Sequence, residues 1–272
     1  MDLLRRCRET VIALLLALPV LLAPATPVQA ACGAVDPEHA AWTSILARRV
    51  ADGRVDYAAL QREDRAALDA YLARLSGTCA DDYARWTTPA KIAFWLNAYN
   101  AFTVQLILDN YPISSIRKIG FLPLAAFRER FIPMPGLKGG TISLDDIEHG
   151  TLRAAFEEPR IHFALVCASV SCPALRAQAY RGADLDAQLD DQARGFLGDP
   201  ARNRFDVAAQ TLFLSAIFDW FNDDFVAAAG SVPAYVAPFM AVAPGPDVKV
   251  EFLDYDWQLN DRKRARDGTR GG

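Results

Sequence analysis

The sequence is poor in the residues and motifs that mark several common classes of enzyme. Only three histidines, His39, His149 and His162, occur among its 272 residues. It contains no glycine-rich phosphate loop after an expected strand, and the Gly-x-Ser-x-Gly and His-Glu-x-x-His patterns are also absent. These absences exclude a P-loop nucleotide enzyme, a lipase-type serine hydrolase and a zincin protease. The net charge of −4 provides no basic excess for binding nucleic acid.

Long apolar runs are scarce as well, and the one that occurs lies in the first thirty residues. There, three arginines precede an apolar run from Val11 to Leu22, and small residues follow at positions 28 and 30. This order predicts a secretory signal peptide over residues 1–30 and a periplasmic or secreted protein. We expect no transmembrane segment after the signal is removed. Cys32 leaves a lipoprotein as an alternative, which Gln29 disfavours because a lipobox requires an aliphatic residue there.

The expected export determines which redox state we expect for the cysteines. Cys7 lies in the expected signal peptide, so four cysteines remain in the mature chain. In an oxidising compartment four thiols are normally paired. Cys32 and Cys79 lie in polar stretches, and we predict a structural disulfide between them. Cys167 and Cys172 share one apolar block, where they form a local disulfide, remain buried, or provide a reactive thiol.

Capping residues and apolar periodicity predict a chain rich in helices. Asp36 and Pro37 predict a helix that begins there and runs to Arg49. Thr88 and Pro89 open the most apolar helix, Ala90–Leu108, which is expected to be buried. Further helices are expected over Tyr57–Leu75, Ser143–Phe156, Asp184–Phe196, from Ser215 onward and over Ser231–Met240, and strands over Ile161–Ala168, Arg204–Val207, Thr211–Leu214 and Val248–Tyr255.

These elements predict the fold class. Helices outnumber strands, and the strands gather in the second half of the chain, which is typical of an α+β domain around a small, mostly antiparallel sheet. No internal repeat or long linker divides the chain, so residues 31–260 are expected to form a single globular domain. The basic segment 261–272 is expected to be a disordered tail.

The densest group of candidate catalytic residues lies between Arg160 and Pro173. His162 opens the expected strand, Cys167 closes it, and Cys172 follows in the next loop. A cysteine nucleophile needs a base or positive surroundings that favour the thiolate. Because His162 and Cys167 are five residues apart, they face opposite sides of a regular strand. His149, on the preceding helix, is therefore an equal candidate for the base. Simple burial of the cysteines is the alternative interpretation.

Polar residues elsewhere complete the set of candidates. Asn97 and Asn100 lie three residues apart on one face of the most apolar helix. Such buried amides either bind the backbone of a neighbouring loop, which we favour, or orient a catalytic imidazole. Glu148 is a second candidate for that orienting group, and His39 is expected to be exposed. The acidic spacings fit no standard zinc or calcium pattern, so no metal or cofactor is expected.

Three ordered segments carry a family resemblance. They are FWLNAYN over residues 94–100, DIEHGTLR over residues 146–153, and HFALVC over residues 162–167 followed by SCP at 171–173. With these segments the chain resembles the Domain of Unknown Function 547 family, which occurs in bacteria and plants, and the resemblance extends over residues 88–225. Some plant members are fused to glutaredoxin-like domains, which implies thiol or glutathione chemistry.

The resemblance also ranks the two cysteines. Plant members often carry serine at the second cysteine position, so the resemblance implies that Cys167 rather than Cys172 is the essential thiol. A papain- or transglutaminase-like arrangement, with cysteine and histidine brought together from separate elements, is implied by analogy alone.

The leading hypothesis is an exported thiol enzyme of the acyl-transfer or amide-hydrolysis type. Cys167 is the nucleophile, His149 or His162 the base, and Glu148 or Asn97 the orienting group. Cys172 either resolves an oxidised Cys167 or packs beside it. The alternatives are a non-enzymatic cell-envelope binding module and a redox or glutathione-linked protein. The expected partner is a small-molecule or peptide substrate, with glutathione as one alternative, and no nucleic acid.

Overall fold

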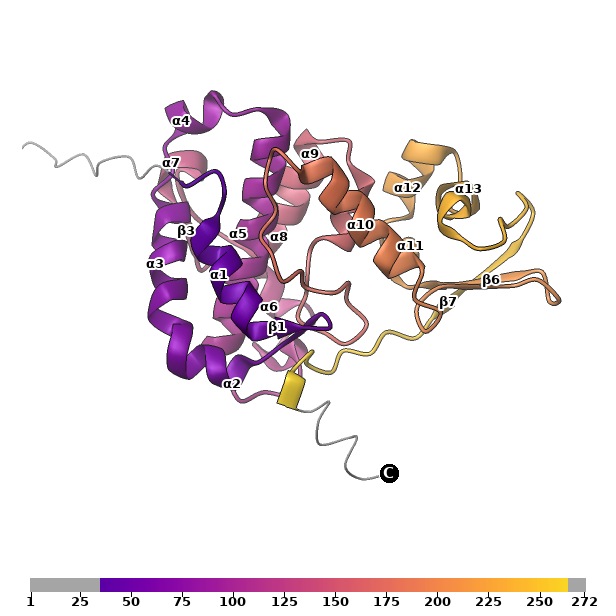
Figure 1. Cartoon of the computed structure of the whole chain (residues 1–272), viewed down its shortest axis with the longest axis horizontal. Helices are drawn as coiled ribbons and strands as arrows, with labels where there is room; N and C mark the ends of the chain where they lie inside the picture. The colour runs from indigo at the N-terminus through magenta and orange to yellow at the C-terminus, as the bar shows by residue number, and fades with distance from the viewer. Residues whose placement is uncertain (1–34, 264–272) are drawn as a thin grey trace, which may run out of the picture. The chain divides into compact units, whose positions relative to one another are not determined.

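The structure is a computed structural model that describes residues 35–263, and the longest helix among these residues is α5 (Thr88–Asp109; Figure 1). The helix begins where the Thr87 hydroxyl accepts a hydrogen bond from the Ala90 amide at 3.3 Å. From Ile92 onward its side chains are buried on nearly every side, as its apolar sequence predicts.

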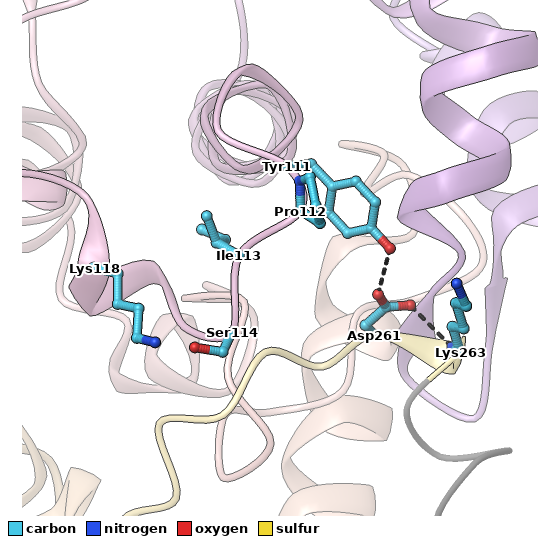
Figure 2. Close-up of a pocket in the computed structure, with 7 residues that line it drawn as sticks. All are labelled: Tyr111, Pro112, Ile113, Ser114, Lys118, Asp261 and Lys263. Carbon is cyan, nitrogen blue, oxygen red and sulfur yellow. Dashed lines mark hydrogen bonds between the residues drawn. The ribbon is translucent and has the colours of Figure 1, made fainter.

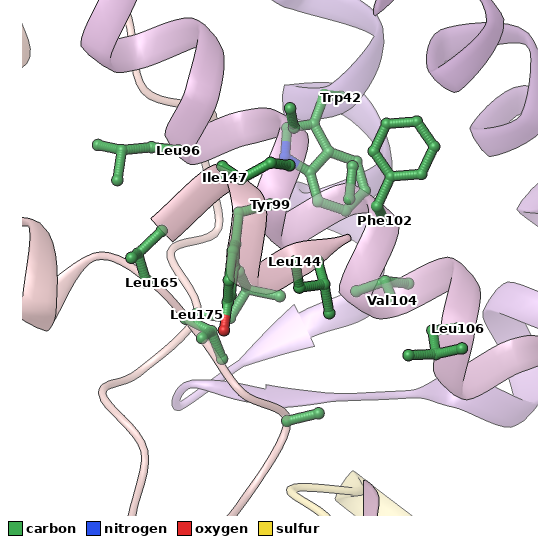
Figure 3. Packing of buried hydrophobic residues seen from close by; sticks show 14 of the residues in the cluster. Trp42, Leu96, Tyr99, Phe102, Val104, Leu106, Leu144, Ile147, Leu165 and Leu175 are labelled. Atoms are coloured by element: carbon green, nitrogen blue, oxygen red, sulfur yellow. The ribbon is translucent and has the colours of Figure 1, made fainter. Parts of the chain in front are cut away.

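Three helices pack against α5, namely α3 (Arg65–Ser76), α8 (Leu144–Ile147) and α10 (Leu185–Leu197). The start of α8 is confirmed as a capping box, in which Ser143 and Asp146 exchange side-chain to backbone hydrogen bonds. Figure 3 shows Leu144 and Ile147 of α8 close to Tyr99 of α5 within the core. A π-helical turn, Glu148–Leu152, and α9 (Arg153–Ala155) extend this helix close to its expected end.

The other helices are short. A π-helical segment, Leu60–Asp64, joins α2 (Tyr57–Ala59) to α3. The helix expected over Tyr57–Leu75 is therefore present, with a wider turn inside it. The remaining α-helices are α1 (Ala40–Arg49), α2 (Tyr57–Ala59), α4 (Ala80–Ala84), α6 (Ala125–Arg128), α7 (Pro135–Lys138), α11 (Ile217–Trp220), α12 (Asn222–Ala229) and α13 (Val232–Val236). Short 3₁₀ helices cover Ile116–Lys118, Pro159–Phe163 and Ala237–Phe239.

Within residues 35–263 the strands form three small sheets. The hairpin of β5 (Arg204–Asp206) and β6 (Thr211–Ser215) is antiparallel, and β7 (Lys249–Leu253) adds to β6 in parallel. The two other sheets are antiparallel pairs, β1 (Val50–Ala51) with β2 (Arg54–Val55) and β3 (Ile132–Met134) with β4 (Gly140–Ile142). The helix-rich α+β class with mostly antiparallel strand pairs is confirmed.

Two hydrophobic clusters form the core. The larger surrounds α5 and includes Trp42, Trp95 and Phe102. The smaller lies between α10, β6 and α12 and is built on Phe163 and Phe218. Within residues 35–263 no helix is both long enough and apolar enough to cross a membrane.

The segment Ile161–Ala168 is not the predicted strand. Its first residues form the 3₁₀ helix Pro159–Phe163, which Glu158 caps by accepting a hydrogen bond from the Arg160 amide at 3.1 Å. The residues that follow are irregular, and the Asn100 side chain binds their backbone instead of a neighbouring strand. The prediction was wrong because an apolar run of this length indicates burial but does not identify a strand.

The N-terminal region corrects two further predictions. Helix α1 begins at Ala40 rather than Pro37, because Asp36 accepts hydrogen bonds from the Glu38 and Ala40 amides and His39 adopts a left-handed backbone with φ of 46°. His39 is buried rather than exposed, and its Nδ1 lies 2.8 Å from the Tyr71 hydroxyl.

The first residues of the expected disordered tail, 261–263, are ordered, and residues 264–272 lie outside the described chain. Asp261 is buried and its carboxylate accepts a hydrogen bond from the Tyr111 hydroxyl at 2.8 Å. The signal peptide, the lipoprotein alternative and the pairing of Cys32 with Cys79 all involve residues outside the described part of the chain.

Candidate active site

A pocket of 490 Å³ is lined by residues from both hydrophobic clusters and from the loops around them. We call its lining residues between 99 and 173 the thiol wall, because they include Cys167 and Cys172 together with Glu148, His149 and His162. We call its lining residues between 217 and 257 the aromatic wall, which consists of Ile217, Trp220, Phe221, Tyr255 and Trp257.

The loop that carries Cys167 is held by a side chain of α5. The Asn100 side-chain amide donates a hydrogen bond to the Ala164 carbonyl, and its oxygen accepts one from the Val166 amide, both at 2.9 Å. Asn100 is buried, so it supplies the partners that these buried backbone groups require. The apolar helix α5 therefore fixes the position of the nucleophile candidate.

The backbone just after Cys167 is strained and pinned to the C-terminal segment. Ala168 has a φ of 60°, a conformation that costs a residue with a side chain about 1 kcal/mol or more. Its carbonyl accepts a hydrogen bond from the Asn260 amide, and the Val170 amide donates one to the Gln258 carbonyl. Strained backbone of this kind concentrates at functional sites, where the surrounding contacts enforce it.

The Cys167 sulfur is surrounded by hydrogen-bonding groups. It lies 2.8 Å from the Cys172 sulfur, 3.1 Å from the Ser169 hydroxyl and 3.3 Å from the Tyr255 hydroxyl. Burial by itself raises the pKa of Cys167, but hydrogen bonds from Cys172, Ser169 and Tyr255 outweigh it and lower the pKa to about 7. A substantial fraction of Cys167 is therefore thiolate at neutral pH.

Cys172 has the opposite character. Its sulfur accepts a hydrogen bond from the Cys167 backbone amide at 2.8 Å, and its side chain is buried. Burial, together with the neighbouring Cys167, raises the pKa of Cys172 well above its ordinary value. Both thiols line the pocket, and the pair therefore consists of an acidic Cys167 and a Cys172 that stays protonated.

His162 belongs to a second group of polar residues in the same pocket. Its ring is buried, stacks on Phe221 with centroids 3.8 Å apart, and places Nε2 2.7 Å from an Asp224 carboxylate oxygen. Burial lowers the pKa of His162 to about 4, so the ring is neutral at pH 7. Asp224 can only accept, which puts the single proton of His162 on Nε2 and leaves Nδ1 with a free lone pair.

The carboxylate that holds His162 is itself fixed by an arginine. Arg153 donates two hydrogen bonds of 2.7 Å to Asp224, one to each oxygen. Hydrogen bonding to Arg153 first, and to His162 in addition, lowers the pKa of Asp224 to about 2. Asp224 is therefore ionised throughout the neutral range.

Glu148 faces the free side of the His162 ring. Its Oε1 lies 3.8 Å from Nδ1, and no described residue is hydrogen-bonded to that nitrogen. Burial, and then the neighbouring charge of Cys167, raises the pKa of Glu148 to about 8. A protonated Glu148 is the group best suited to the Nδ1 lone pair. The two carboxyl groups on either side of the His162 ring thus differ in charge at pH 7, because Glu148 is mainly protonated and Asp224 is ionised.

His149, the other candidate base, lies at the rim of the pocket. Its side chain is 41% exposed, its Nδ1 lies 2.9 Å from an Arg153 nitrogen, and its Nε2 lies 3.6 Å from Asp145. Desolvation lowers its pKa. None of the hydrogen bonds that the Cys167 sulfur makes with described residues involves an imidazole, so neither histidine forms a direct pair with the thiol.

Asn97 is not part of the pocket. Its amide donates to the Tyr180 carbonyl at 2.8 Å, and its oxygen accepts from the Tyr180 amide at 2.9 Å. Both ends of the side chain are therefore occupied by backbone, which confirms the interpretation that we favoured and contradicts an orienting role beside an imidazole.

Sequence reasoning missed three residues of the site. They are Asp224, Tyr255 and Ser169, none of which the sequence singled out as a candidate site residue. Asp224 lies 62 residues from His162 and Tyr255 lies 88 residues from Cys167, so no local motif joins them. The one available signal was the helical spacing of Phe221, Asp224 and Phe225, which puts an acid on an aromatic face.

A second pocket, of 530 Å³, lies near the C-terminal end of the described chain (Figure 2). Its carboxylate, Asp261, is held by the Tyr111 hydroxyl and by the Lys263 backbone amide. Because no thiol or imidazole lines it, this pocket does not serve the chemistry considered above. Among residues 35–263 no cluster of three or more His, Cys, Asp or Glu side chains has a metal-binding arrangement.

The thiol wall lies within the part of the chain that matches a family of known sequences. Residues 83–197 match the family described as Protein of unknown function, DUF547. No curated protein and no solved structure matches the chain. The matched residues contain all three segments that carry the resemblance, and they include Asn100, Glu148, His162, Cys167 and Cys172. Residues 83–197 of this chain are therefore similar to the DUF547 family.

Proposed function

We propose that this protein is a thiol-dependent enzyme that transfers or hydrolyses acyl groups, with Cys167 as its nucleophile. The observation that carries the proposal is a pocket lined by both Cys167 and Glu148, in which the Cys167 sulfur lies within 3.3 Å of three hydrogen-bonding groups. These contacts lower the pKa of Cys167 to about 7, and burial raises the pKa of Glu148 to about 8. Groups with shifted pKa values in one pocket are typical of catalytic sites, since each is then in the protonation state that it needs.

The first half-reaction uses both groups. The Cys167 thiolate attacks the substrate carbonyl carbon and forms a carbon–sulfur bond, while the carbonyl electrons move onto oxygen. Glu148 then gives its proton to the leaving nitrogen or oxygen as the bond to that atom breaks. The product is a thioester on Cys167 and a carboxylate at Glu148.

The second half-reaction returns the site to its starting state. The Glu148 carboxylate takes a proton from water or another acceptor, which attacks the thioester carbon, and the Cys167 thiolate leaves. His162 positions Glu148 through its Nδ1 lone pair, and Asp224 fixes the tautomer of His162. In this proposal Glu148 replaces the histidines as the acid and base, and His162 takes the positioning role.

Acylation by an activated ester tests this proposal. We expect 4-nitrophenyl acetate to acetylate Cys167, as detected by mass spectrometry of the peptide that contains it. Glu148→Gln should accumulate the acetylated form because the water that attacks the thioester lacks a base, whereas the exposed Glu157→Gln should not. Acetylation confined to other residues, or equal accumulation in both variants, would overturn the proposal.

A thiol-redox function is the second candidate, favoured by the 2.8 Å contact between the two sulfurs. In that function the Cys167 thiolate attacks a disulfide such as oxidised glutathione and releases one thiol. Cys172 then displaces the second thiol, so that the protein gains a disulfide and the substrate is reduced to two thiols. Mass spectrometry after acid quench tests this candidate, because it requires a Cys167–Cys172 or mixed disulfide.

The exported location and the envelope binding module remain proposals of the same rank. Export follows from residues 1–30 alone. A binding module without catalysis predicts that Cys167 is neither acylated nor oxidised under the two tests above, so they separate the three candidates.

A further inference from the structure

An apolar loop protrudes beside the mouth of the pocket. Between the 3₁₀ helix Ile116–Lys118 and α6, Phe121 is fully exposed, Leu122 is 73% exposed and Leu124 is 43% exposed. Single exposed apolar residues are common on soluble proteins, but a run of neighbouring ones at a loop tip indicates a contact surface. We call residues 120–124 the apolar loop.

The conformation of the apolar loop is set at both ends. Gly120 has a φ of 77° and Leu124 a φ of 62°, so the chain turns sharply on either side of the tip. A leucine in this region of backbone space is rare, because its side chain crowds the backbone. The fold thus tolerates a strained backbone that leaves Phe121 and Leu122 exposed to water.

Basic side chains flank the apolar loop. Arg117 and Lys118 precede it and Arg128 and Arg130 follow it, all four exposed, while Glu129 is the single acidic residue between positions 117 and 130. Arg130 pairs with Asp146, but no salt bridge to another described residue involves the other three. In a chain of net charge −4 this segment is a local positive surface.

We propose that the apolar loop docks on an anionic lipid bilayer. Phe121 and Leu122 enter the boundary between headgroups and acyl chains, and the flanking cations contact lipid phosphates. A convex apolar tip surrounded by cations fits a bilayer surface better than a protein groove, because the charges complement the headgroups. Pro123, Leu124 and Arg117 also line the 490 Å³ pocket, so docking brings the mouth of that pocket to the bilayer.

Co-sedimentation with vesicles tests the proposal, using the chain from residue 31 onward. We expect binding to vesicles that contain phosphatidylglycerol, weaker binding to pure phosphatidylcholine, and release at high salt. The double variant Phe121→Ser with Leu122→Ser should weaken binding about tenfold or more, because both apolar side chains lose their place in the boundary. Lys118→Gln with Arg128→Gln should weaken binding to the anionic vesicles about tenfold.

Two control variants establish whether the loss of binding is specific to the apolar loop. Phe252→Ser with Val207→Ser removes an exposed aromatic and aliphatic pair elsewhere and should leave binding unchanged. Cys167→Ser should also bind normally, so failure of the proposed acyl chemistry does not affect this test. Equal loss of binding in the Phe252 and Val207 variant would overturn the proposal. So would sedimentation and light scattering that show the apolar loop joining two copies of the chain instead of binding vesicles.

Discussion

The two walls of the candidate pocket differ in how their groups are held and in what they contribute. The thiol wall lies within the residues that match the family, and side chains on α5 and the 144–155 helical region position its reactive groups. The aromatic wall lies outside that match and consists of aromatic rings and Ile217, with Trp220, Tyr255 and Trp257 packed together at centroid distances of 4.7 to 5.8 Å.

The candidate reactive groups lie in the matched segment, whereas some of the residues that set their pKa values and tautomers lie in the C-terminal region. Cys167, Glu148 and His162 belong to the matched segment, but the hydroxyl of Tyr255 helps to lower the pKa of Cys167. Asp224, on α12 near Phe221 of the aromatic wall, fixes the tautomer of His162. The matched segment therefore contains the candidate reactive groups, and residues of the C-terminal region contribute to their protonation states.

The largest effect is expected from breaking the support beneath the thiol wall. Asn100→Ala leaves the Ala164 carbonyl and the Val166 amide buried without a partner, which should lower the free energy of unfolding by about 3 kcal/mol. Asn97→Ala should lower the free energy of unfolding by a similar amount, because it leaves the Tyr180 carbonyl and amide without their hydrogen-bond partner. Urea unfolding measures both.

The two asparagine variants should differ in thiol reactivity. Asn100→Ala releases the loop before Cys167 and should raise the apparent pKa of that thiol, whereas Asn97→Ala should leave the pKa unchanged. Equal shifts of the Cys167 pKa in both variants would show that Asn100 has no specific role in the thiol wall.

A pH-dependent effect is expected at Glu148. Its pKa is about 8 in the folded protein but near 4.3 in the unfolded chain, so the folded state alone holds the proton between these values. Stability from this group is complete below the lower value and is lost as the pH rises through about 8.

Glu148→Gln removes that loss. As the pH rises from about 5 to about 8, the free energy of unfolding of the native protein should fall by about 2 to 3 kcal/mol relative to that of the variant. This figure is reduced because the side chain is partly exposed. Urea unfolding at the two pH values measures the difference, and Glu157→Gln serves as the exposed control. A difference that does not change with pH would contradict the raised pKa.

A smaller effect tests the link between the C-terminal region and the thiol wall. Asp224→Asn weakens the bonds to Arg153 and His162 and should destabilise the protein by about 2 kcal/mol, since the pair is partly exposed. The neighbouring exposed Asp223→Asn should have no effect. Equal unfolding curves for these two variants would show that Asp224 does not secure the site.

Local signals predicted much of the fold. The capping box at Ser143, the proline near the start of α5 and the hairpin of β5 and β6 are each visible within a few residues, and each is confirmed. The apolar run after Arg160 was misinterpreted, because its backbone partners come from Asn100, 64 and 66 residues earlier in the chain.

The site was harder to predict because its charge states depend on distant residues. The motifs identified Cys167, Glu148 and His162. The predicted strand is absent, but the expectation drawn from it, that His162 and Cys167 do not pair directly, agrees with the contacts of the Cys167 sulfur. Asp224 and Tyr255 could not be found, because aromatic and acidic residues on short helices and in loops are common without any function.

The smallest expected effect concerns the hydrogen bonds to Cys167. Cys172→Ala removes the neighbour whose hydrogen bond lowers the pKa of Cys167, so this pKa should rise by about one unit. Tyr255→Phe, which changes the C-terminal region instead, should shift it in the same direction by less. A lower pKa in either variant would contradict the assigned role of these donors.

The pH dependence of Cys167 alkylation tests the central claim most directly. Iodoacetamide is applied to the reduced native protein across a range of pH, and mass spectrometry follows the peptide that contains Cys167. The site predicts a reaction rate that rises with an apparent pKa of about 7. An apparent pKa at or above the ordinary thiol value of about 8.5, or a Cys167 that does not react, would contradict an activated thiolate.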